Sequence, residues 1–335
     1  MKTSSAHQYI DRNSRQIVTE KLVGDRAIAL IYSTIRENAP ALFRALTSSR
    51  MSSLLSLYHF DFLDRKRGSG RALFARLGVD WSECVEECGH YQTPRQVFER
   101  QIRYWDLRPM NDDPKIVVSP ADARVLIGSF AENSSLFIKE KLFTPAELFG
   151  RHSPWQKRFT AGDFAVFRLT PDKYHYNHLP VSGRVEDIYQ VDGQYHSCNP
   201  AALVALASLH AKNKRVVTII DTDIPGGSRI GLVAMIEVVA LMIGDIVQAY
   251  SSKRYLSPCA IEPRMVVEKG CPKSYYRPGS STDILVFEKN RIAFSRDLVH
   301  NSRRNDVSSR FVNTSGRAMV ETDLKVRSAI GYRLV

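Results

Sequence analysis

Two serines stand where a loop runs into an apolar segment, in the stretch SYYRPGSSTDILVF at residues 274–287. Ser280 and Ser281 follow a Pro-Gly pair that is common in turns, and residues 284–287 have the pattern of a buried strand. A serine hydroxyl acts as a nucleophile only when a base lies next to it. Taken alone, the stretch is typical of a turn that leads into a sheet, so the rest of the chain must decide between a turn and a reactive site.

Two other short motifs suggest chemistry but have simpler explanations. Cys84, Cys88 and His90 offer metal-binding atoms, but no second ligand pair follows at zinc-site spacing. A helix end capped by Gly89 explains this motif equally well, and we expect no metal site. The glycine-rich segment 226–231 lacks the strand-loop-helix frame of a phosphate-binding loop, so we interpret it as a surface turn.

The elements that must position these residues change in character along the chain. Residues 17–60 carry apolar side chains at helical spacing with arginines alongside, typical of helices that pack on a core or lie on a bilayer surface. From about residue 116, short β-branched segments separated by turn residues predict strands. We therefore expect an α+β fold, in which a helical N-terminal part (1–110) packs on an antiparallel β-sandwich or barrel-like core (111–335).

Composition narrows the class of protein. The 335 residues contain no run of eighteen uncharged apolar residues and no apolar N-terminal signal, so neither a spanning helix nor secretion is expected. Five scattered cysteines argue against a disulfide framework and favour a reducing cytoplasm. The net charge of +12 attracts polyanions. Because the basic residues are spread out and lack an aromatic stacking pattern, we expect an anionic membrane surface and no nucleic acid as the partner.

Five segments occur in an order that characterises one family. They are VVSPADAR (117–124), PDKYHYNHLPVSGRV (171–185), NPAALVALASLHAKNKRVV (199–217), GSST (279–282) and ETDLKVRSAIG (321–331). Together they resemble the phosphatidylserine decarboxylase family, including its Ser-Pro-Ala-Asp, Tyr-His-x-x-His and Gly-Ser-Thr motifs. The N-terminal half is similar to the helical half of that family, so the likeness covers nearly the whole chain. Each motif alone is weak, and their joint order and spacing are specific.

The resemblance implies a decarboxylase that makes its own pyruvoyl cofactor by cutting itself. The hydroxyl of Ser281 would attack the carbonyl of Ser280 and convert the peptide bond to an ester. Elimination would then cut the chain and leave a pyruvoyl group derived from Ser281. The products would be a β chain, residues 1–280, and an α chain, residues 281–335, which stays in the sheet.

The same resemblance assigns the supporting residues. His178 matches the catalytic histidine, and Asp122 matches the carboxylate that orients it, so Ser281, His178 and Asp122 form the expected catalytic group. His178 is also our candidate for the acid that returns a proton after carbon dioxide leaves. His175 is expected to contact the substrate or to act as a structural partner.

Several positions depart from the family pattern. The glycine that precedes the cut is replaced by Ser280, which creates a second candidate nucleophile. Counting back from Phe287 favours Ser281, whereas counting from Gly270 favours Ser280. Asp283 stands where the family has an apolar residue entering the strand, and the sequence offers no reason for a carboxylate there.

Three functions follow from these observations. The first is conversion of phosphatidylserine to phosphatidylethanolamine and carbon dioxide by an enzyme bound peripherally at the cytoplasmic face of a membrane. The second is a soluble decarboxylase of a free amino acid, for example an aromatic one, with the same pyruvoyl chemistry. The third is a non-catalytic relative that binds a partner. The α and β chains are each other's partners, and a homodimer is a further hypothesis.

Overall fold

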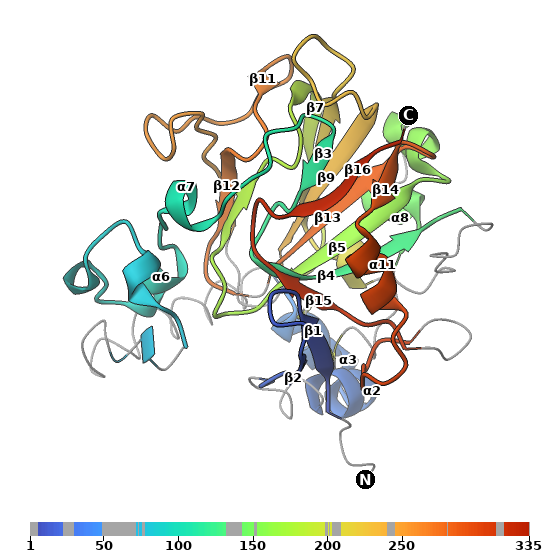
Figure 1. The fold of residues 1–335 in the computed structure, drawn as a ribbon. Helices are drawn as coiled ribbons and strands as arrows, with labels where there is room; N and C mark the ends of the chain where they lie inside the picture. Colours follow the sequence, from blue (N-terminus) through green and yellow to red (C-terminus); the bar gives the residue numbers. More distant parts are fainter. Residues whose placement is uncertain are drawn as a thin grey trace.

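The computed structural model describes residues 6–22, 30–48, 72, 74–75, 78–131, 143–150, 153–197, 200, 202, 209–239, 245–279, 281–312 and 318–334. These residues form one large sheet, two small sheets and a set of short helices. Figure 1 shows β13 (Ser281–Phe287) in the middle of the large sheet, between β9 and β5. Ser281 therefore begins a strand in the middle of the large sheet.

The large sheet contains ten strands in the order β11-β7-β8-β9-β13-β5-β4-β15-β1-β2 within the described residues. All neighbours in it are antiparallel except β1 and β15, which are parallel. Besides β13, its strands are β1 (Gln8–Asp11), β2 (Ile17–Thr19), β4 (Ala123–Ser129), β5 (Asp163–Leu169), β7 (Gly183–Val191), β8 (Arg215–Asp221), β9 (Leu232–Val239), β11 (Val266–Val267) and β15 (Thr322–Leu324).

Two three-stranded sheets cover one face of the large sheet. The first has the order β10-β12-β6 and the second β14-β16-β3. Their strands are β3 (Ile116–Val118), β6 (Tyr176–His178), β10 (Ile246–Gln248), β12 (Pro272–Tyr276), β14 (Ile292–Phe294) and β16 (Ala329–Arg333). Alternate residues of β13 serve two layers, because Leu285 and Phe287 join the main core under the small sheets, whereas Ile284 and Val286 join a cluster on the opposite face.

The helices are short, and several begin with strong local signals. Thr93 and Thr144 each form a capping box, with Gln96 and Glu147 respectively, and a proline follows each threonine. The helical elements are η1 (Ile31–Ile35), α2 (Arg36–Asn38), α3 (Pro40–Leu46), η3 (Trp81–Glu83), η4 (Cys88–His90), α6 (Pro94–Phe98), α7 (Tyr104–Leu107), α8 (Pro145–Phe149), η5 (Pro154–Phe159), α10 (Leu209–Lys212) and α11 (Arg296–Ser302). Across the described ranges, none of these helices has the length and apolar content needed to span a bilayer.

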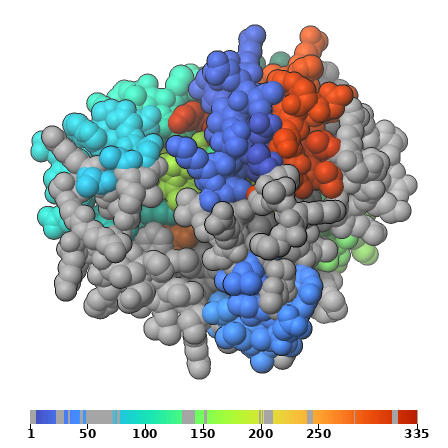
Figure 2. Space-filling model, turned by 90° about the horizontal axis from the view of Figure 1, so that it is seen from below, coloured from blue at the N-terminus to red at the C-terminus, as the bar shows by residue number. Residues whose placement is uncertain are grey.

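The expected α+β character with a β-rich core is observed, but the sheets that the described residues form are open and do not close into a barrel. The helical pattern expected from residue 17 is wrong at its start, where β2 forms, because β2 pairs with β1 at the edge of the large sheet. A helical N-terminal half packed on the core is not shown within the described residues, and residues 49–71 lie outside them. Figure 2 shows the N-terminal strands, in dark blue, beside the orange-red C-terminal segment.

Candidate active site

Ser281 is the first residue of β13 and lies inside the large sheet. Its cross-strand neighbours are Leu169 on β5 and Val239 on β9. The side chain is fully buried, and its Oγ has no hydrogen-bond partner in the described part of the chain. Gly279 has a φ of +153°, which residues with a side chain rarely adopt. Ser280 lies outside the described residues, so the predicted cut is located by Ser281 alone.

Asp122 lies at the same end of the sheet as Ser281. It immediately precedes β4, which is two strands from β13, so about 10 Å separates the two chain segments. Arg108 binds the carboxylate with both Nε and Nη2, at 3.1 and 2.8 Å, and the Val326 N–H donates to Oδ1 at 2.7 Å. Burial acts to raise the pKa of Asp122, but the charges of Arg108 and Lys325 and the hydrogen bonds from Arg108 and Val326 together lower that pKa, so the carboxylate is ionised. Thr282 on β13 is opposite Arg168 on β5, and Arg168 is opposite Arg124 on β4. The first residues of β13 and β4 are therefore level with each other in the sheet.

His178 is held in one tautomer at the end of β6. Its Nδ1 lies 2.9 Å from the carbonyl oxygen of Gly270, and its Nε2 lies 2.9 Å from the Tyr174 hydroxyl. A carbonyl only accepts, so Nδ1 carries the proton and Nε2 accepts from Tyr174. The backbone N–H of His178 donates to the carbonyl oxygen of Pro120 at 2.7 Å, which joins β6 to the segment before Asp122. Burial lowers the pKa of His178 to about 3, so the ring is neutral at pH 7.

The structure thus brings Ser281, His178 and Asp122 to one end of the sheet without the hydrogen bonds of a triad. Both His178 nitrogens and both Asp122 oxygens have other partners. Asp122 acts on His178 through its charge, which raises the pKa of the imidazole against the larger effect of burial. The assigned roles of these residues stay predictions.

His175 is a second buried, neutral imidazole, three residues before His178. Its ring stacks on Phe98 with 3.6 Å between ring centroids, and its carbonyl accepts the Tyr276 N–H at 3.0 Å. Neither ring nitrogen makes a hydrogen bond of good geometry with the described residues. Burial, together with the Arg100 charge, lowers the pKa of His175 to about 3. Two imidazoles with different surroundings are therefore available, one anchored and one open to a new partner.

A buried polar cluster that the sequence analysis missed lies on the Ser281 face of β13. Glu237 on β9 is directly opposite Asp283 on β13, and both side chains are fully buried. Glu237 forms an ion pair of 2.6 Å with Lys273, which is also fully buried. Asn177, Ser274 and Gln248 complete its hydrogen bonds. Charged residues inside apolar strands were the available signal, but their meeting depends on the packing of β12 over β9.

A cavity of about 470 Å³ opens beside His178. Its lining includes Gly270, whose carbonyl holds His178, and Tyr104, whose ring meets the His178 ring edge-on at 4.7 Å. Leu256 is 69% exposed at its edge. The cationic lining residues are Lys253, Arg254, Lys269 and Arg327. An anionic group is therefore favoured next to the anchored imidazole.

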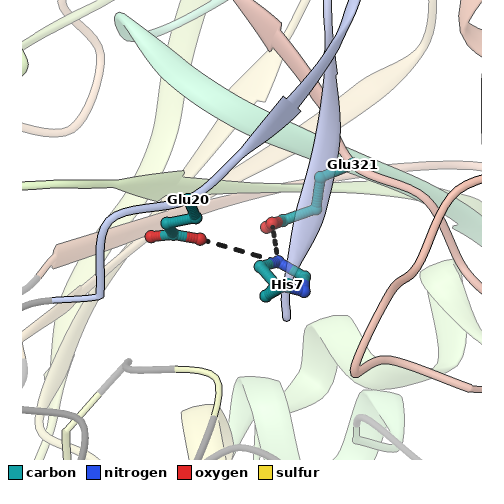
Figure 3. Close-up of side chains that lie close together, drawn as sticks. All are labelled: His7, Glu20 and Glu321. Atoms are coloured by element: carbon teal, nitrogen blue, oxygen red, sulfur yellow. Dashed lines mark hydrogen bonds and ion pairs between the residues drawn. The ribbon is translucent and has the colours of Figure 1, made fainter. Parts of the chain in front are cut away.

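A group of metal-binding residue types on the other face of the sheet is a structural ion network. His7, Glu20 and Glu321 place ligand atoms within 4.8 Å of one another (Figure 3). His7 Nδ1 accepts the Arg310 N–H at 3.2 Å, so Nε2 carries the proton and donates to Glu321 at 2.9 Å. Arg168 already bridges the two carboxylates, at 2.8 and 2.6 Å. With no free imidazole lone pair and a cation in place, the site is unsuited to a metal ion.

Comparison with known proteins places the chain in a family. The family model of phosphatidylserine decarboxylase matches residues 95–313. The phosphatidylserine decarboxylase proenzyme of Fusobacterium nucleatum is 28% identical over 299 residues, which cover 88% of this chain and 92% of that protein. The proenzyme of Ruminiclostridium cellulolyticum is 26% identical over 293 residues, 87% and 91% of the two chains. Phosphatidylserine decarboxylase proenzyme 3 of Schizosaccharomyces pombe is 31% identical over 259 residues, 76% of this chain and 24% of that protein. This chain belongs to the phosphatidylserine decarboxylase family, as its motifs indicated.

Proposed function

We propose that the chain is a proenzyme that cuts itself between Ser280 and Ser281 and then converts phosphatidylserine to phosphatidylethanolamine and carbon dioxide. The observation that carries the proposal is the buried Ser281 Oγ at the head of the central strand, without a partner among the described residues. Buried hydroxyls are normally hydrogen-bonded, so an unpartnered one here fits a nucleophile. The proposed products are a β chain of residues 1–280 and an α chain of residues 281–335.

His178 is the proposed base for the cut. Because Nδ1 donates to Gly270, the lone pair of the ring is on Nε2, which is the atom that would take the Ser281 proton. Tyr174 occupies Nε2 in this structure, so its hydroxyl must give way to the serine. The ionised Asp122 favours the protonated ring through its charge and without direct contact.

The surroundings of residue 281 fit a pyruvoyl group at the new N-terminus. When formed, that group supplies a ketone that withdraws electrons while carbon dioxide leaves. Ser281 is fully buried, so the reacting position is shielded from bulk water. We assign substrate contact to His175, whose ring nitrogens are open to a new partner, and return of the proton to the product to His178.

An anionic lipid fits the cavity beside His178. Its basic lining suits a phosphate-bearing head group, and the exposed Leu256 suits an apolar neighbour such as the edge of a bilayer. With the net charge of +12, these features support peripheral binding at the cytoplasmic face of a membrane. No specific observation favours a free amino acid as the substrate, and a homodimer stays a prediction.

Chain cleavage tests the proposal. Intact mass should show two chains, with the smaller one beginning at residue 281 and blocked to Edman sequencing. Ser281→Ala should remain a single 37.9 kDa chain, whereas the matched control Ser280→Ala should still be cut. The reverse result would move the nucleophile to Ser280, and an uncut wild type would overturn the proposal.

Co-sedimentation with anionic vesicles tests the lipid substrate. A cleaved enzyme that does not bind these vesicles would favour a free amino acid as the substrate.

A further inference from the structure

A chain of hydroxyl groups leads away from His178. The Tyr174 hydroxyl lies 2.9 Å from His178 Nε2 and 2.7 Å from the Tyr255 hydroxyl. The Tyr255 hydroxyl in turn lies 2.9 Å from the carbonyl oxygen of Ile102 and accepts the Ile102 N–H at 3.2 Å. The chain therefore runs from the proposed base, through two tyrosines, to the backbone of one residue.

Backbone contacts fix the far end of this chain. Ile102 is fully buried and pairs with Cys84 in an isolated β-bridge. Tyr255 belongs to the loop between β10 and β11, where it is half-buried while its neighbours Arg254 and Leu256 are exposed. Its side chain therefore turns inward to Ile102. Because both backbone groups of Ile102 hold the Tyr255 hydroxyl, its oxygen is a fixed partner for the hydroxyl that contacts His178.

While His178 is neutral, the chain has two protons for three contacts. The contact of Tyr174 with His178, the contact between the two tyrosines and the contact of Tyr255 with the Ile102 carbonyl each need one hydroxyl proton. The lone pair of Nε2 and the carbonyl oxygen can only accept. Burial raises the pKa of both tyrosines above its ordinary value, so each hydroxyl keeps its single proton. One of the three contacts is therefore always without a proton.

Protonation of His178 would supply the missing proton. The imidazolium Nε2–H would donate to Tyr174, Tyr174 to Tyr255, and Tyr255 to the Ile102 carbonyl, so that every contact has one donor and one acceptor. A charged donor strengthens a hydrogen bond, and hydrogen bonds that point in one direction polarise one another. The chain therefore favours the cationic ring, whereas burial disfavours it.

We propose that Tyr255 is a positioning residue, which orients the Tyr174 hydroxyl so that His178 can hold a proton at Nε2. This inference rests on the proposed roles of His178 as the base for self-cleavage and as the acid that returns a proton to the product. Tyr255 acts through Tyr174 and touches neither the serine nor the substrate. One proton enters the chain at Nε2 when the base takes it, and it leaves from Nε2 when the acid returns it.

Cleavage kinetics of single and double variants test the inference. Full-length chains are made by pulsed cell-free synthesis, and conversion of the precursor to two chains is followed by intact mass. Tyr255→Phe removes one neutral hydrogen bond of the chain and should slow cleavage about 3–10-fold. Tyr174→Phe removes the acceptor of a charged N–H and should slow it about 10–100-fold. The double variant should be as slow as Tyr174→Phe alone, because Tyr255 acts only through Tyr174.

Tyr176→Phe is the matched control for the loss of a hydroxyl in this aromatic cluster. The Tyr176 ring stacks on Tyr174, but its hydroxyl accepts from Gln101 at 3.2 Å and is not part of the chain. Cleavage of this variant should stay close to the wild-type rate. Circular dichroism of each variant in an uncut Ser281→Ala background checks that the sheet forms.

Nitrogen NMR of His178 in the Ser281→Ala background gives a readout that a packing role would not move. At pH 7 the ring is neutral, and the Nε2 resonance reports how fully Tyr174 donates to it. Tyr255→Phe should shift this resonance toward that of a hydrogen-bonded nitrogen, because Tyr174 then has no second acceptor in the chain. Tyr174→Phe should shift it in the opposite direction, toward that of a free nitrogen.

Three results would overturn the inference. They are cleavage of Tyr255→Phe at the wild-type rate, a double variant that is slower than Tyr174→Phe by the full factor of Tyr255→Phe, and Nε2 resonances that shift in the same direction in the two single variants. None of them touches the proposed self-cleavage, which fails only if wild type stays uncut or neither serine is needed.

Discussion

Two buried groups of charges lie on opposite faces of the large sheet, and they differ in balance. The matched network contains three carboxylates and three cations: Glu20, Glu321, Asp323, Arg124, Arg168 and Lys173. The mismatched cluster contains two carboxyl groups, Glu237 and Asp283, and one cation, Lys273. In the matched network every carboxylate has a cation within ion-pair distance, which stabilises the structure. An unbalanced set favours binding of a proton, and here Asp283, whose pKa is raised by burial and by the Glu237 charge, lies two residues from Ser281.

The matched network also joins the two chains that the proposed cleavage would produce. Glu321 and Asp323 belong to residues 281–335, whereas their partners Arg168, Lys173 and His7 belong to residues 1–280. Parallel pairing of β1 with β15 adds backbone contacts across the same boundary. We therefore expect the network to matter most for stability.

Breaking the matched network should have the largest effect. Arg168→Met leaves Glu20 and Glu321 buried without their shared cation, and it should lower the free energy of unfolding by about 3–5 kcal/mol. Denaturant unfolding in an uncut Ser281→Ala background measures this. Arg184→Met, which removes an exposed ion pair with Glu186, is the control and should change little. Equal losses in both variants would contradict the comparison.

Removing the unbalanced carboxyl group should act in the opposite direction. Asp283→Leu deletes a buried polar group that lacks a partner at Oδ2, so it should raise the free energy of unfolding at pH 7 by about 1–3 kcal/mol. The same denaturant series reports the change. A destabilised Asp283→Leu would show that the carboxyl group is structural.

The pH dependence of stability should distinguish the two groups by sign. Burial acts to raise the pKa of Glu321, but Arg168 and His7 together lower that pKa below the ordinary 4.5. The stabilisation by Glu321 is therefore present above pH 4.5 and is lost on acidification. The pKa of Asp283 is raised by burial above 3.8, so its contribution declines as pH rises above 3.8. In unfolding measurements from pH 3 to 9, the loss of unfolding free energy caused by Glu321→Gln should become smaller below pH 4.5. The advantage of Asp283→Asn should grow above pH 4, and parallel curves for the two variants would refute the distinction.

Unburied charges beside the cavity should contribute least to stability. Lys253→Glu with Arg254→Glu should change the free energy of unfolding by no more than about 0.5 kcal/mol and leave chain cleavage intact. The same pair should weaken binding to anionic vesicles and raise the KM for phosphatidylserine with kcat nearly unchanged. A loss of cleavage would show that the cavity shapes the cut rather than the substrate.

The sequence predicts individual strands well, and it predicts contacts between residues far apart in the sequence poorly. The alternation in β13 and the apolar runs of β5 and β8 identify strands, because they reflect local burial. The family motifs identify Ser281, His178 and Asp122 as candidates. The register of the large sheet places Ser281 and Asp122 at one end, and the bond from the His178 backbone N–H to Pro120 brings β6 to the segment before Asp122. The pairing of Glu237 with Lys273, and of His7 with Glu321, joins residues 36 and 314 positions apart and follows only from the packing of distant strands. Asp283 looked anomalous in the sequence because its pKa is raised by burial and by the charge of Glu237, which lies on the distant strand β9.

Because β13 lies in the middle of the sheet, we expect that the two chains made by the proposed cut could not reassemble after separation. A strand hydrogen-bonded on both sides, to β5 and β9, acquires its place while it is still covalently joined to the preceding residues. After the cut, residues 281–335 would have to insert between β5 and β9 as a separate molecule, and would lose translational and rotational entropy in doing so. In the intact chain the covalent link to residue 280 avoids that loss. We expect that separated chains will not reassemble, so the enzyme has one opportunity to fold, before it becomes active.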